Sequence, residues 1–454
     1  MKETFAKMSP FQVDPQPILD MYQFEDDDFS PANQEEKAAM VERHKSISYW
    51  QDAWRRFKAN KVSMVALFVF ILCLLFAFLG PRVIPYSYSE QYRSSQKLGP
   101  LEYSKGENTI RSIQNTCDGF YATALRPGSL TSLSKGDYYI NYKGTVYAFH
   151  FDKSVEKSVI ILNKNSADPL ILVKDTDIKD GEYTKYTVID FTNSPAENAK
   201  EIKLITSVFP HVFGTDSSGR DLMARTMYGA RVSIIIGIVA ALIVLVIGSL
   251  YGAISGLSGG AVDFVMMRIV ELIYSIPEVL IVLLLQVVLK DPLQQWFDAG
   301  KTAFARSMSD LGAGIVSIFI TFGLLYWVTM ARIVRGQVLQ LKSQEYVTAA
   351  KALGASTGRT IRRHLLPNCV GALVITTCLQ IPSAIFLESF LSFLGLGVSA
   401  PMASLGSLCS DALETITIYP YRLVFPAVIL TIIVLSLNLV GDGLRDALDP
   451  RLKK

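Results

Sequence analysis

Long apolar runs recur along this chain and set its predicted architecture. The first covers residues 62–80, and at about 1.5 Å per residue it reaches roughly 28 Å, close to the thickness of a bilayer core. The complete set of runs is 62–80, 232–255, 264–289, 311–331, 372–394 and 423–440. This pattern predicts an all-α polytopic membrane protein with six transmembrane helices.

Basic residues between the runs predict the orientation. Four lie within residues 55–61, seven within the segment 332–370 and four after residue 440. Six crossings place these three segments on one side of the membrane, and an excess of Lys and Arg in short loops marks the cytoplasmic side. Both termini are therefore predicted to be cytoplasmic.

Polar and amphipathic sequence precedes the first run. Residues 1–47 are acidic, with four consecutive carboxylates at 25–28, and we expect a disordered cytoplasmic tail. In the stretch 48–61, Trp50, Trp54 and Phe57 recur at helical spacing while the basic residues lie largely off that stripe. Residues 48–81 are thus predicted to form an amphipathic elbow helix on the membrane surface, followed by the first transmembrane helix.

The long segment 82–209, between the first and second runs, follows a different pattern. Short alternating or apolar runs are separated by turn-rich sequence, at 137–142, 145–151, 158–162, 169–173 and 186–191. We expect a small β-rich extracytoplasmic domain, inserted between the first and second transmembrane helices. Cys117 is its only cysteine, and no nucleophile–base pair stands out, so a structural or docking role is favoured over an enzyme.

Composition supports a membrane protein and narrows the chemistry. Half of the residues are hydrophobic, 19% are charged, against roughly 25% in soluble domains, and the net charge is +3. Nucleic-acid binding through global charge is therefore disfavoured. The five cysteines and four histidines are scattered, which argues against a disulfide scaffold or a metal site.

The segment 332–370 carries the most informative motif. Residues 345–354 suit a short, small-sided helix that starts near Glu345 and ends at a glycine cap at Gly354, and Pro367 is expected to end the next helical stretch. Spacing alone allows two interpretations. The segment could be a helical hairpin whose basic residues fix topology, or a helix that sits in a groove on another protein.

These residues resemble the EAA loop of ABC-importer permeases. The matching positions are Glu345, Ala349, Ala350, Gly354, Leu366 and Pro367, whereas His364 stands where that pattern often has isoleucine. The resemblance implies a coupling helix that docks into an ATPase subunit.

Three further stretches resemble the oligopeptide and dipeptide importer permeases. They are 213–233 at the entry to the second run, 391–398 after the fifth, and 438–451 at the end of the chain. The resemblance covers about residues 48–80 and 210–454. It implies a permease core at 210–446 with five transmembrane helices and a cytoplasmic tail at 447–454. Residues 82–209 depart from it, because typical members have a much shorter connection there.

Several polar residues and glycines near the outer membrane face are candidates for the translocation path or outer gate: Asp216, Arg220, Glu388, Gly395 and Gly397. Asp216, Arg220 and Asp221 could form a salt-bridged cap on the second helix, and the two glycines allow a tight or re-entrant turn. Glu388 could line the path or pack within the protein.

Two features of the third and fifth runs concern charge pairing and helix shape. Arg268 and Glu271 are spaced to pair along one helix, and Pro277 and Pro382 are expected to kink their helices.

The sequence lacks a phosphate-binding P-loop, since Arg359 stands where the required lysine would be. No cofactor is therefore expected on this chain. The resemblance implies a permease subunit of an ATP-driven peptide importer in the cytoplasmic membrane. Its implied partners are a homologous second permease, two P-loop ATPase subunits that use ATP-Mg, and an extracytoplasmic binding protein.

Three alternatives remain open. The same machinery could import nickel complexes or glycans. The chain could instead be an ion-driven secondary transporter, although it shows no clear inverted repeat. It could also be a sensor or assembly protein that uses residues 82–209 as a receptor domain.

Overall fold

The computed structural model describes residues 48–89, 91, 95–104, the strands and short links between 119 and 201, 209–300, 303–309, 311–398 and 402–448. The predicted tail at 1–47, Cys117 and residues 449–454 lie outside this part. Within it, six helices are long and apolar enough to cross a membrane: Lys61–Phe78, Leu222–Ser258, Glu278–Ala299, Ala313–Leu341, Thr357–Phe393 and Tyr421–Leu448. The fold is mostly helical, as predicted.

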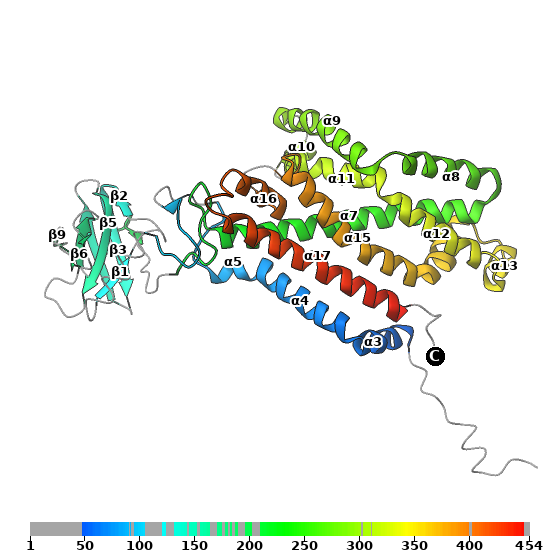
Figure 1. Ribbon diagram of the computed structural model, residues 1–454, viewed down its shortest axis with the longest axis horizontal. Coiled ribbons are helices and arrows are strands. Elements are labelled where there is room, and N and C mark those ends of the chain that lie inside the picture. The colour runs from blue at the N-terminus through cyan, green and yellow to red at the C-terminus, as the bar shows by residue number, and fades with distance from the viewer. Residues whose placement is uncertain are drawn as a thin grey trace, which may run out of the picture. The chain divides into compact units, whose positions relative to one another are not determined.

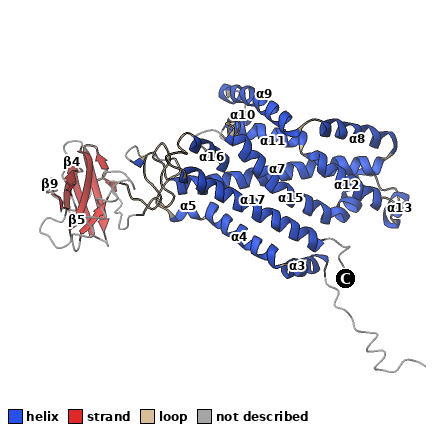
Figure 2. Ribbon diagram, in the orientation of Figure 1, coloured by secondary structure: helices blue, strands red, loops and turns tan. Residues whose placement is uncertain are grey.

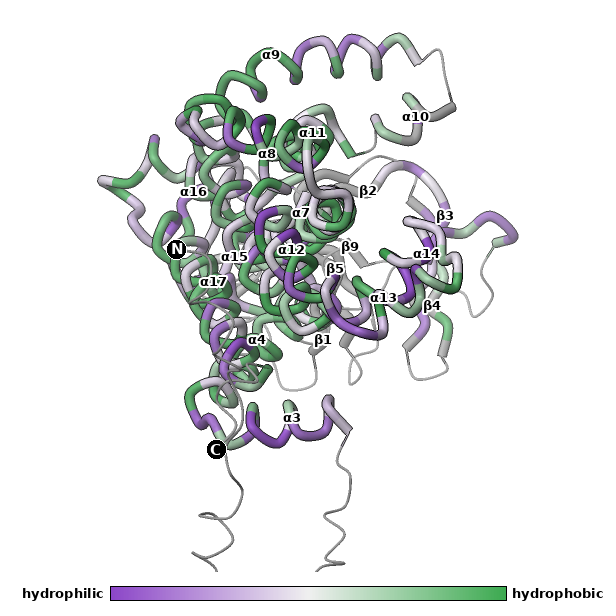
Figure 3. Tube along the Cα trace, turned by 90° about the vertical axis from the view of Figure 1, so that its right-hand side faces the viewer, coloured by the Kyte–Doolittle hydropathy of each residue, from purple (hydrophilic) through white to green (hydrophobic). Residues whose placement is uncertain are grey.

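The helix predicted before the first span is present as α3 (Tyr49–Ala59). Asn60 then separates it from α4 (Lys61–Phe78), because its side chain caps the new helix by accepting hydrogen bonds from the backbone N–H groups of Val62 and Ser63 at 3.1 and 3.3 Å. Figure 3 shows the contrast in composition, with α3 largely hydrophilic and α4 largely hydrophobic. A one-turn helix, α5 (Gly80–Val83), follows.

The long helices pack side by side in one bundle (Figure 1). α4 contacts α7 (Leu222–Ser258) and α17 (Tyr421–Leu448), and α15 (Val370–Phe393) packs against both α7 and α17. Small residues allow these close approaches. On α7, Gly248, Gly252 and Gly256 are spaced four apart and face α12 (Trp327–Leu341), so that a Cβ at Gly252 would lie 2.4 Å from the carbonyl oxygen of Ala331.

The prediction of one continuous third helix over 264–289 is wrong. The chain forms α8 (Gly260–Ser275) and then α9 (Glu278–Ala299), with a break at Ile276 and Pro277. Proline has no N–H to donate and pushes the preceding residue into an extended conformation, and Ile276 has φ −85° and ψ 137°. The kink expected at Pro277 is therefore a full break, whereas Pro382 lies inside the continuous helix α15.

Shorter helices complete the membrane region. α10 (Ala303–Ser309) and α11 (Ala313–Leu325) lead into α12. α13 (Glu345–Ala352) and α14 (Thr357–Thr360) form the predicted helical segment before α15, and α16 (Leu405–Leu413) lies between α15 and α17, in contact with both.

The strands gather in a part of their own, drawn in red in Figure 2. One sheet has the order β1-β5-β6-β9 with β2 also on β5, a second has the order β10-β3-β4, and β7 pairs with β8. The strands are β1 (Phe120–Thr123), β2 (Thr131–Leu133), β3 (Gly136–Tyr142), β4 (Thr145–Phe151), β5 (Val155–Asn163), β6 (Leu170–Lys174), β7 (Ile178–Lys179), β8 (Glu182–Tyr183), β9 (Thr187–Val188) and β10 (Lys200–Glu201). Each of the five runs predicted here overlaps a strand, and β1, β2, β7, β8 and β10 were not predicted.

Candidate functional site

The coupling segment exposes one face of α13 and anchors the other. Val347 is fully buried, in one hydrophobic cluster with Val338, Ile361 and Leu365. On the opposite side, Leu353 is 89% exposed and Tyr346 is 40% exposed. Ala349 is also exposed and Ala350 is half-buried, so the small-sided face predicted for this helix is available for contact.

Gly354 ends α13 as predicted, and its backbone explains why glycine is needed. Its φ is +82°, in the left-handed region, and a Cβ there would meet nothing within 4 Å. The N–H of Gly354 donates to the carbonyl of Lys351 at 2.9 Å and that of Ala355 to Ala350 at 3.0 Å, the two bonds of a Schellman motif. Conformation rather than packing therefore selects glycine at this position.

Leu366 and Pro367 lie after α14 within a helical stretch that does not stop. The expectation that Pro367 ends this stretch is wrong, because the chain remains helical from Thr357 to Phe393. A π-helical turn at Ile361–Leu365 precedes a 3-10 turn at Leu366–Cys369, and the N–H of Leu366 reaches back to Ile361. These turns accommodate the proline ring, which an unbroken α-helix could not hold without a clash.

Ionic and polar contacts connect α12, the helix before the coupling segment, to the last residues of α7 and the first residues of α8. The guanidinium of Arg335 on α12 forms two hydrogen bonds of 2.6 Å to the carboxylate of Asp263. Ser255 on α7 also donates to Asp263, and the ammonium of Lys342 donates to the carbonyl of Gly256 at 3.2 Å. α12, which leads into α13, is thus fixed to α7 by packing and a hydrogen bond from Lys342, and to the start of α8 by the ion pair of Arg335 with Asp263.

We expect Asp263→Asn to lower the free energy of unfolding by about 1–2 kcal/mol at pH 7, allowing for the 31% exposure of the Arg335 side chain. The hydrogen bond from Arg335 lowers the pKa of the Asp263 carboxyl from 3.8 to about 2. A lowered folded-state pKa contributes stability that is complete above 3.8 and is lost as the pH falls through about 2. Thermal unfolding in detergent at a series of pH values measures the difference from wild type, which should shrink over that window.

The exposed pair of Arg268 and Glu271 supplies a matched control for that experiment. The two side chains lie 2.6 Å apart, as predicted, and are 64% and 51% exposed. Glu271→Gln should therefore change the free energy of unfolding by less than about 1 kcal/mol. A destabilisation by Asp263→Asn that does not depend on pH would contradict the assigned role of Arg335.

Glu388 is fully buried at a junction of three helices. Its carboxylate accepts hydrogen bonds from Ser392 at 2.7 Å and Ser389 at 3.3 Å on α15, and from Ser233 on α7 at 2.8 Å. Ser233 in turn accepts from the backbone N–H of Leu405, the first residue of α16, at 3.4 Å. The carboxylate therefore joins α7, α15 and the start of α16, and a role on the translocation path stays a prediction.

The two glycines after α15 serve different purposes. Gly395 has φ +78° with open space around its Cα, so it provides the turn. A Cβ at Gly397 would lie 2.0 Å from the hydroxyl oxygen of Ser392, so this glycine allows the chain to fold back closely onto α15. The Ser392 hydroxyl accepts from the N–H of Val398 at 3.1 Å, which links the turn to Glu388.

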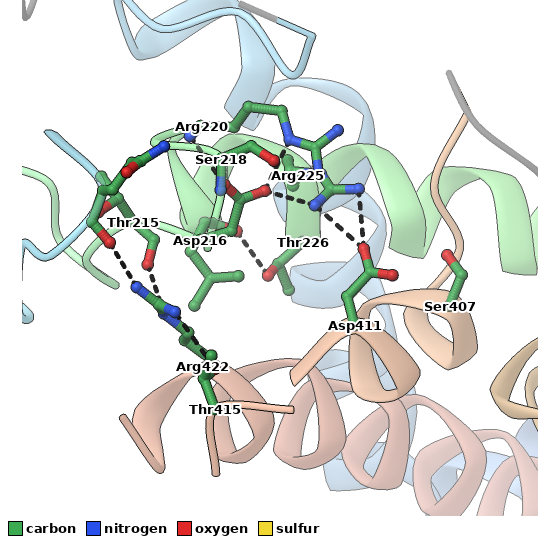
Figure 4. Close-up of polar contacts among 12 residues, drawn as sticks. Thr215, Asp216, Ser218, Arg220, Arg225, Thr226, Ser407, Asp411, Thr415 and Arg422 are labelled. Carbon is green, nitrogen blue, oxygen red and sulfur yellow. Dashed lines mark hydrogen bonds and ion pairs between the residues drawn. The ribbon is translucent and has the colours of Figure 1, made fainter. Parts of the chain in front are cut away.

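Asp216 is the centre of a polar network at the start of α7 (Figure 4). Its carboxylate accepts from Arg220 Nε at 2.7 Å and from Arg225 Nη1 at 2.6 Å. It also accepts from the backbone N–H groups of Ser218 and Arg220 at 2.8 and 2.9 Å. Arg225 reaches Asp411 on α16 at 3.4 Å, so the network connects the beginning of α7 to the helix that follows the glycine turn.

The expected cap is present in the pair of Asp216 with Arg220, whereas Asp221 has different partners. It is the N-cap of α7, where it accepts from the N–H of Ala224 at 2.6 Å, and its other oxygen lies 2.8 Å from Nδ1 of His211. Arg422 connects the start of α17 to the segment before α7, because its guanidinium donates to the carbonyls of Thr215 at 2.9 Å and Gln96 at 2.6 Å.

The structure therefore groups the predicted residues into two places. Glu345, Ala349, Ala350 and Gly354 lie on or directly after α13, followed by Leu366 and Pro367. Asp216, Arg220, Glu388, Gly395 and Gly397 lie around the start of α7 and the end of α15. The residues that complete the second group, Arg225, Ser233 and Ser392, were not predicted, although Ser392 is four positions after Glu388 and so on the same helix face.

Two protein-family models match parts of this chain. Residues 48–100 match the model for the N-terminal TM domain of oligopeptide transport permease C, and residues 245–454 match the binding-protein-dependent transport system inner membrane component. A dipeptide transport system permease protein, DppC of Bacillus subtilis, is 33% identical over 98% of this chain and 99% of its own length. The chain belongs to this permease family.

Two further matches are a permease of the same family and a chain of a solved transporter structure. An oligopeptide transport system permease protein, OppC of Bacillus subtilis, is 48% identical over 54% of this chain and 73% of its own length. A chain of the MetNI methionine ABC transporter in an inward-facing conformation is a more distant structural match, with a TM-score of 0.38, 17% identity and coverage of 50% of this chain and 96% of that one.

The segment 82–209, where a departure from typical family members was expected, is shared with some relatives and not with others. The Bacillus subtilis OppC match covers 54% of this chain, whereas the DppC match extends over 98% of this chain and 99% of that protein. A relative of similar length therefore carries a segment of comparable size. As a family member, the chain is a multi-pass protein of the cytoplasmic membrane and the permease component of a transporter.

Proposed function

We propose that this chain is the permease subunit of an ATP-driven ABC importer that carries peptides across the cytoplasmic membrane. The observation that supports this most strongly is the geometry of α13, an exposed helix whose residues match the coupling motif. Leu353 and Tyr346 offer an apolar surface to a partner, while Val347 holds the helix to the bundle. The OppC and DppC relatives favour peptides as substrate.

The partners follow from this role. Two P-loop ATPase subunits, which bind ATP-Mg, receive α13 and its counterpart on a homologous second permease. An extracytoplasmic binding protein delivers the peptide. Both termini and the segment 332–370 face the cytoplasm in this arrangement, and this chain itself holds no cofactor.

Force from the ATPases would enter at α13 and continue through α12. The glycine face of α7 brings the backbones of α7 and α12 into contact at Gly252. The ion pair of Arg335 with Asp263 connects α12 to the start of α8. A displacement of α13 therefore moves α12 and α7 together, because their close-packed contact transmits strain, and the ion pair carries the start of α8 along with α12. That movement would switch access to the path from outside to inside.

On the outer side, Asp216, Arg220, Glu388, Gly395 and Gly397 would shape the outer gate. Asp216 is linked to α16 through Arg225, which also contacts Asp411, and Glu388 joins α7 to the turn after α15 through Ser233 and Ser392. We further propose that residues 82–209 form an extracytoplasmic β-rich domain that docks the binding protein or caps the channel mouth.

Affinity purification tests the assembly. A tagged chain extracted in mild detergent should recover a second permease and P-loop ATPases in stoichiometric amounts, identified by mass spectrometry. A co-purified binding protein that retains peptide would support the substrate class. Repeated isolation of well-folded chain alone would contradict the subunit role and favour a self-contained transporter.

A further inference from the structure

A cavity of about 500 Å³ lies among the spans, away from both groups of predicted residues. Its polar lining consists of Glu278 at the start of α9, Tyr326 and Thr329 at the junction of α11 with α12, Gln380 and Ser383 on α15, and Tyr274 on α8. The volume falls within the range of small-molecule sites, and apolar residues such as Ile281 and Leu325 fill the remaining wall.

Two separations between helices and one proline within a continuous helix meet at this cavity. α8 and α9 are separated at Pro277, α11 and α12 are separated at Tyr326, and Pro382 lies inside α15 between two lining residues. Irregular backbone at membrane depth is tolerated where it is buried in protein or lines a water-filled cavity. In secondary transporters, substrate sites are typically formed by discontinuous helices, and we apply the same physical argument to this cavity.

Glu278 gives the cavity its charge. Among the described residues that line it, Glu278 is the only one with a formal charge. No cationic side chain in the described part of the chain lies within ion-pair distance of its carboxylate. Arg332 approaches this region but stacks its guanidinium 4.0 Å over the ring of Tyr274. Glu278 is exposed on this chain, and a carboxylate that faced lipid near the middle of the apolar run 264–289 would be costly, so we expect it to face a polar partner or a water-filled path.

We propose that this cavity is a transit site in which Glu278 receives the ammonium group of the peptide being imported. An ammonium has three N–H donors. The carboxylate of Glu278 is the charged acceptor for one of these N–H groups. The oxygens of Thr329, Gln380 and Ser383, on the facing walls of the cavity, are neutral acceptors for the others. A bare divalent cation fits less well, because it prefers several carboxylates, and the described residues contain no cluster of metal ligands.

The ammonium can come from the amino terminus of a peptide or from a lysine side chain, and the substrates chosen for the test distinguish them. The assembled transporter, with its binding protein, is reconstituted in proteoliposomes loaded with ATP. Uptake of trialanine, N-acetyl-trialanine and N-acetyl-Ala-Lys-Ala is compared between wild type and Glu278→Gln at saturating peptide. Because the binding protein is the same in every sample, its own selectivity cancels in the ratio between the two transporters.

We expect Glu278→Gln to reduce uptake of trialanine at least fivefold relative to N-acetyl-trialanine. A matching loss for N-acetyl-Ala-Lys-Ala would extend the site to lysine side chains, and a loss confined to trialanine would assign it to the amino terminus. Glu271→Gln, the same change on an exposed carboxylate outside the cavity, should leave the ratios unchanged. Equal effects of Glu278→Gln on all three peptides, or none, would overturn the proposal.

A second measurement does not depend on transport or on the binding protein. In Ser383→Cys, alkylation of the new thiol by a maleimide should be slowed by trialanine and less so by N-acetyl-trialanine, and adding Glu278→Gln should abolish the difference. Equal protection by both peptides would overturn the site. The inference rests on peptide import by this transporter, so a wild type that imports none of the peptides would refute that function, whereas normal import with unchanged ratios would refute this site alone.

Discussion

Gly354→Pro is expected to reduce peptide uptake by the assembled transporter at least tenfold while the chain still inserts in the membrane. Gly354 has φ +82°, whereas proline is restricted to about −65°. Proline also lacks the N–H that Gly354 donates to Lys351, so the Schellman motif that ends α13 cannot form. The exposed end of the helix, with Leu353, would then no longer present one defined surface to the ATPase. Uptake and ATP hydrolysis are measured on the same proteoliposomes.

The expected signature is uncoupling, with ATP hydrolysis retained and uptake lost. A graded pair of variants isolates the backbone effect. Both Gly354 and Gly358 have open space around Cα, but only Gly354 has positive φ, so Gly354→Ala should cost about 1–2 kcal/mol locally, whereas Gly358→Ala, inside the helix α14, should not destabilise the chain. Glu345→Lys, which places a positive charge at the start of α13, should act in the same direction as Gly354→Pro. Normal uptake by both Gly354→Pro and Glu345→Lys would refute the coupling role.

Properties set by local sequence were predictable, and α13 illustrates this. A polar start, small residues and a glycine after the last turn predict a short helix without knowledge of its neighbours. The number of membrane-spanning helices was predictable for the same reason, because the backbone N–H and C=O groups of an apolar run in the bilayer must form their hydrogen bonds within a helix. The break at Pro277 shows the limit, since a proline within an apolar run is compatible with a kink or with a full break.

The contacts within the sites could be predicted only where both partners were near in sequence. Arg268 with Glu271 and Asp216 with Arg220 lie three and four positions apart, and both pairs are present. The pair of Asp263 and Arg335 is separated by 72 positions, and Ser233 reaches Glu388 across 155. The periodicity of the sequence does not predict these distant contacts, because they depend on which helix faces pack together. The cavity around Glu278 escaped prediction for the same reason.

Arg225→Met is expected to lower the free energy of unfolding by about 1.5–3 kcal/mol, because it removes one of the two arginine partners of the buried Asp216 carboxylate, which keeps only Arg220. The side chains of Arg225 and Asp216 are only 5% and 7% exposed, and they lie 2.6 Å apart. The loss would also release Asp411 on α16 from α7. Thermal unfolding of the purified complex in detergent, followed by intrinsic fluorescence, measures the change against wild type.

Comparing Arg220→Met with Arg225→Met separates the effect of burial on stability from the effect of losing an ion pair. It contacts the same oxygen of Asp216 at 2.7 Å, but its side chain is 16% exposed, so water can compensate part of the loss and Arg220→Met should cost less than Arg225→Met. If the penalty arises from an uncompensated buried charge, adding Asp216→Asn to Arg225→Met should recover part of the lost stability, since the neutral amide costs less to bury. Equal destabilisation by the two arginine variants, with no recovery in the double variant, would mean that Arg225 acts through packing of its aliphatic chain. In that case the network would fix the start of α7 by shape rather than by charge.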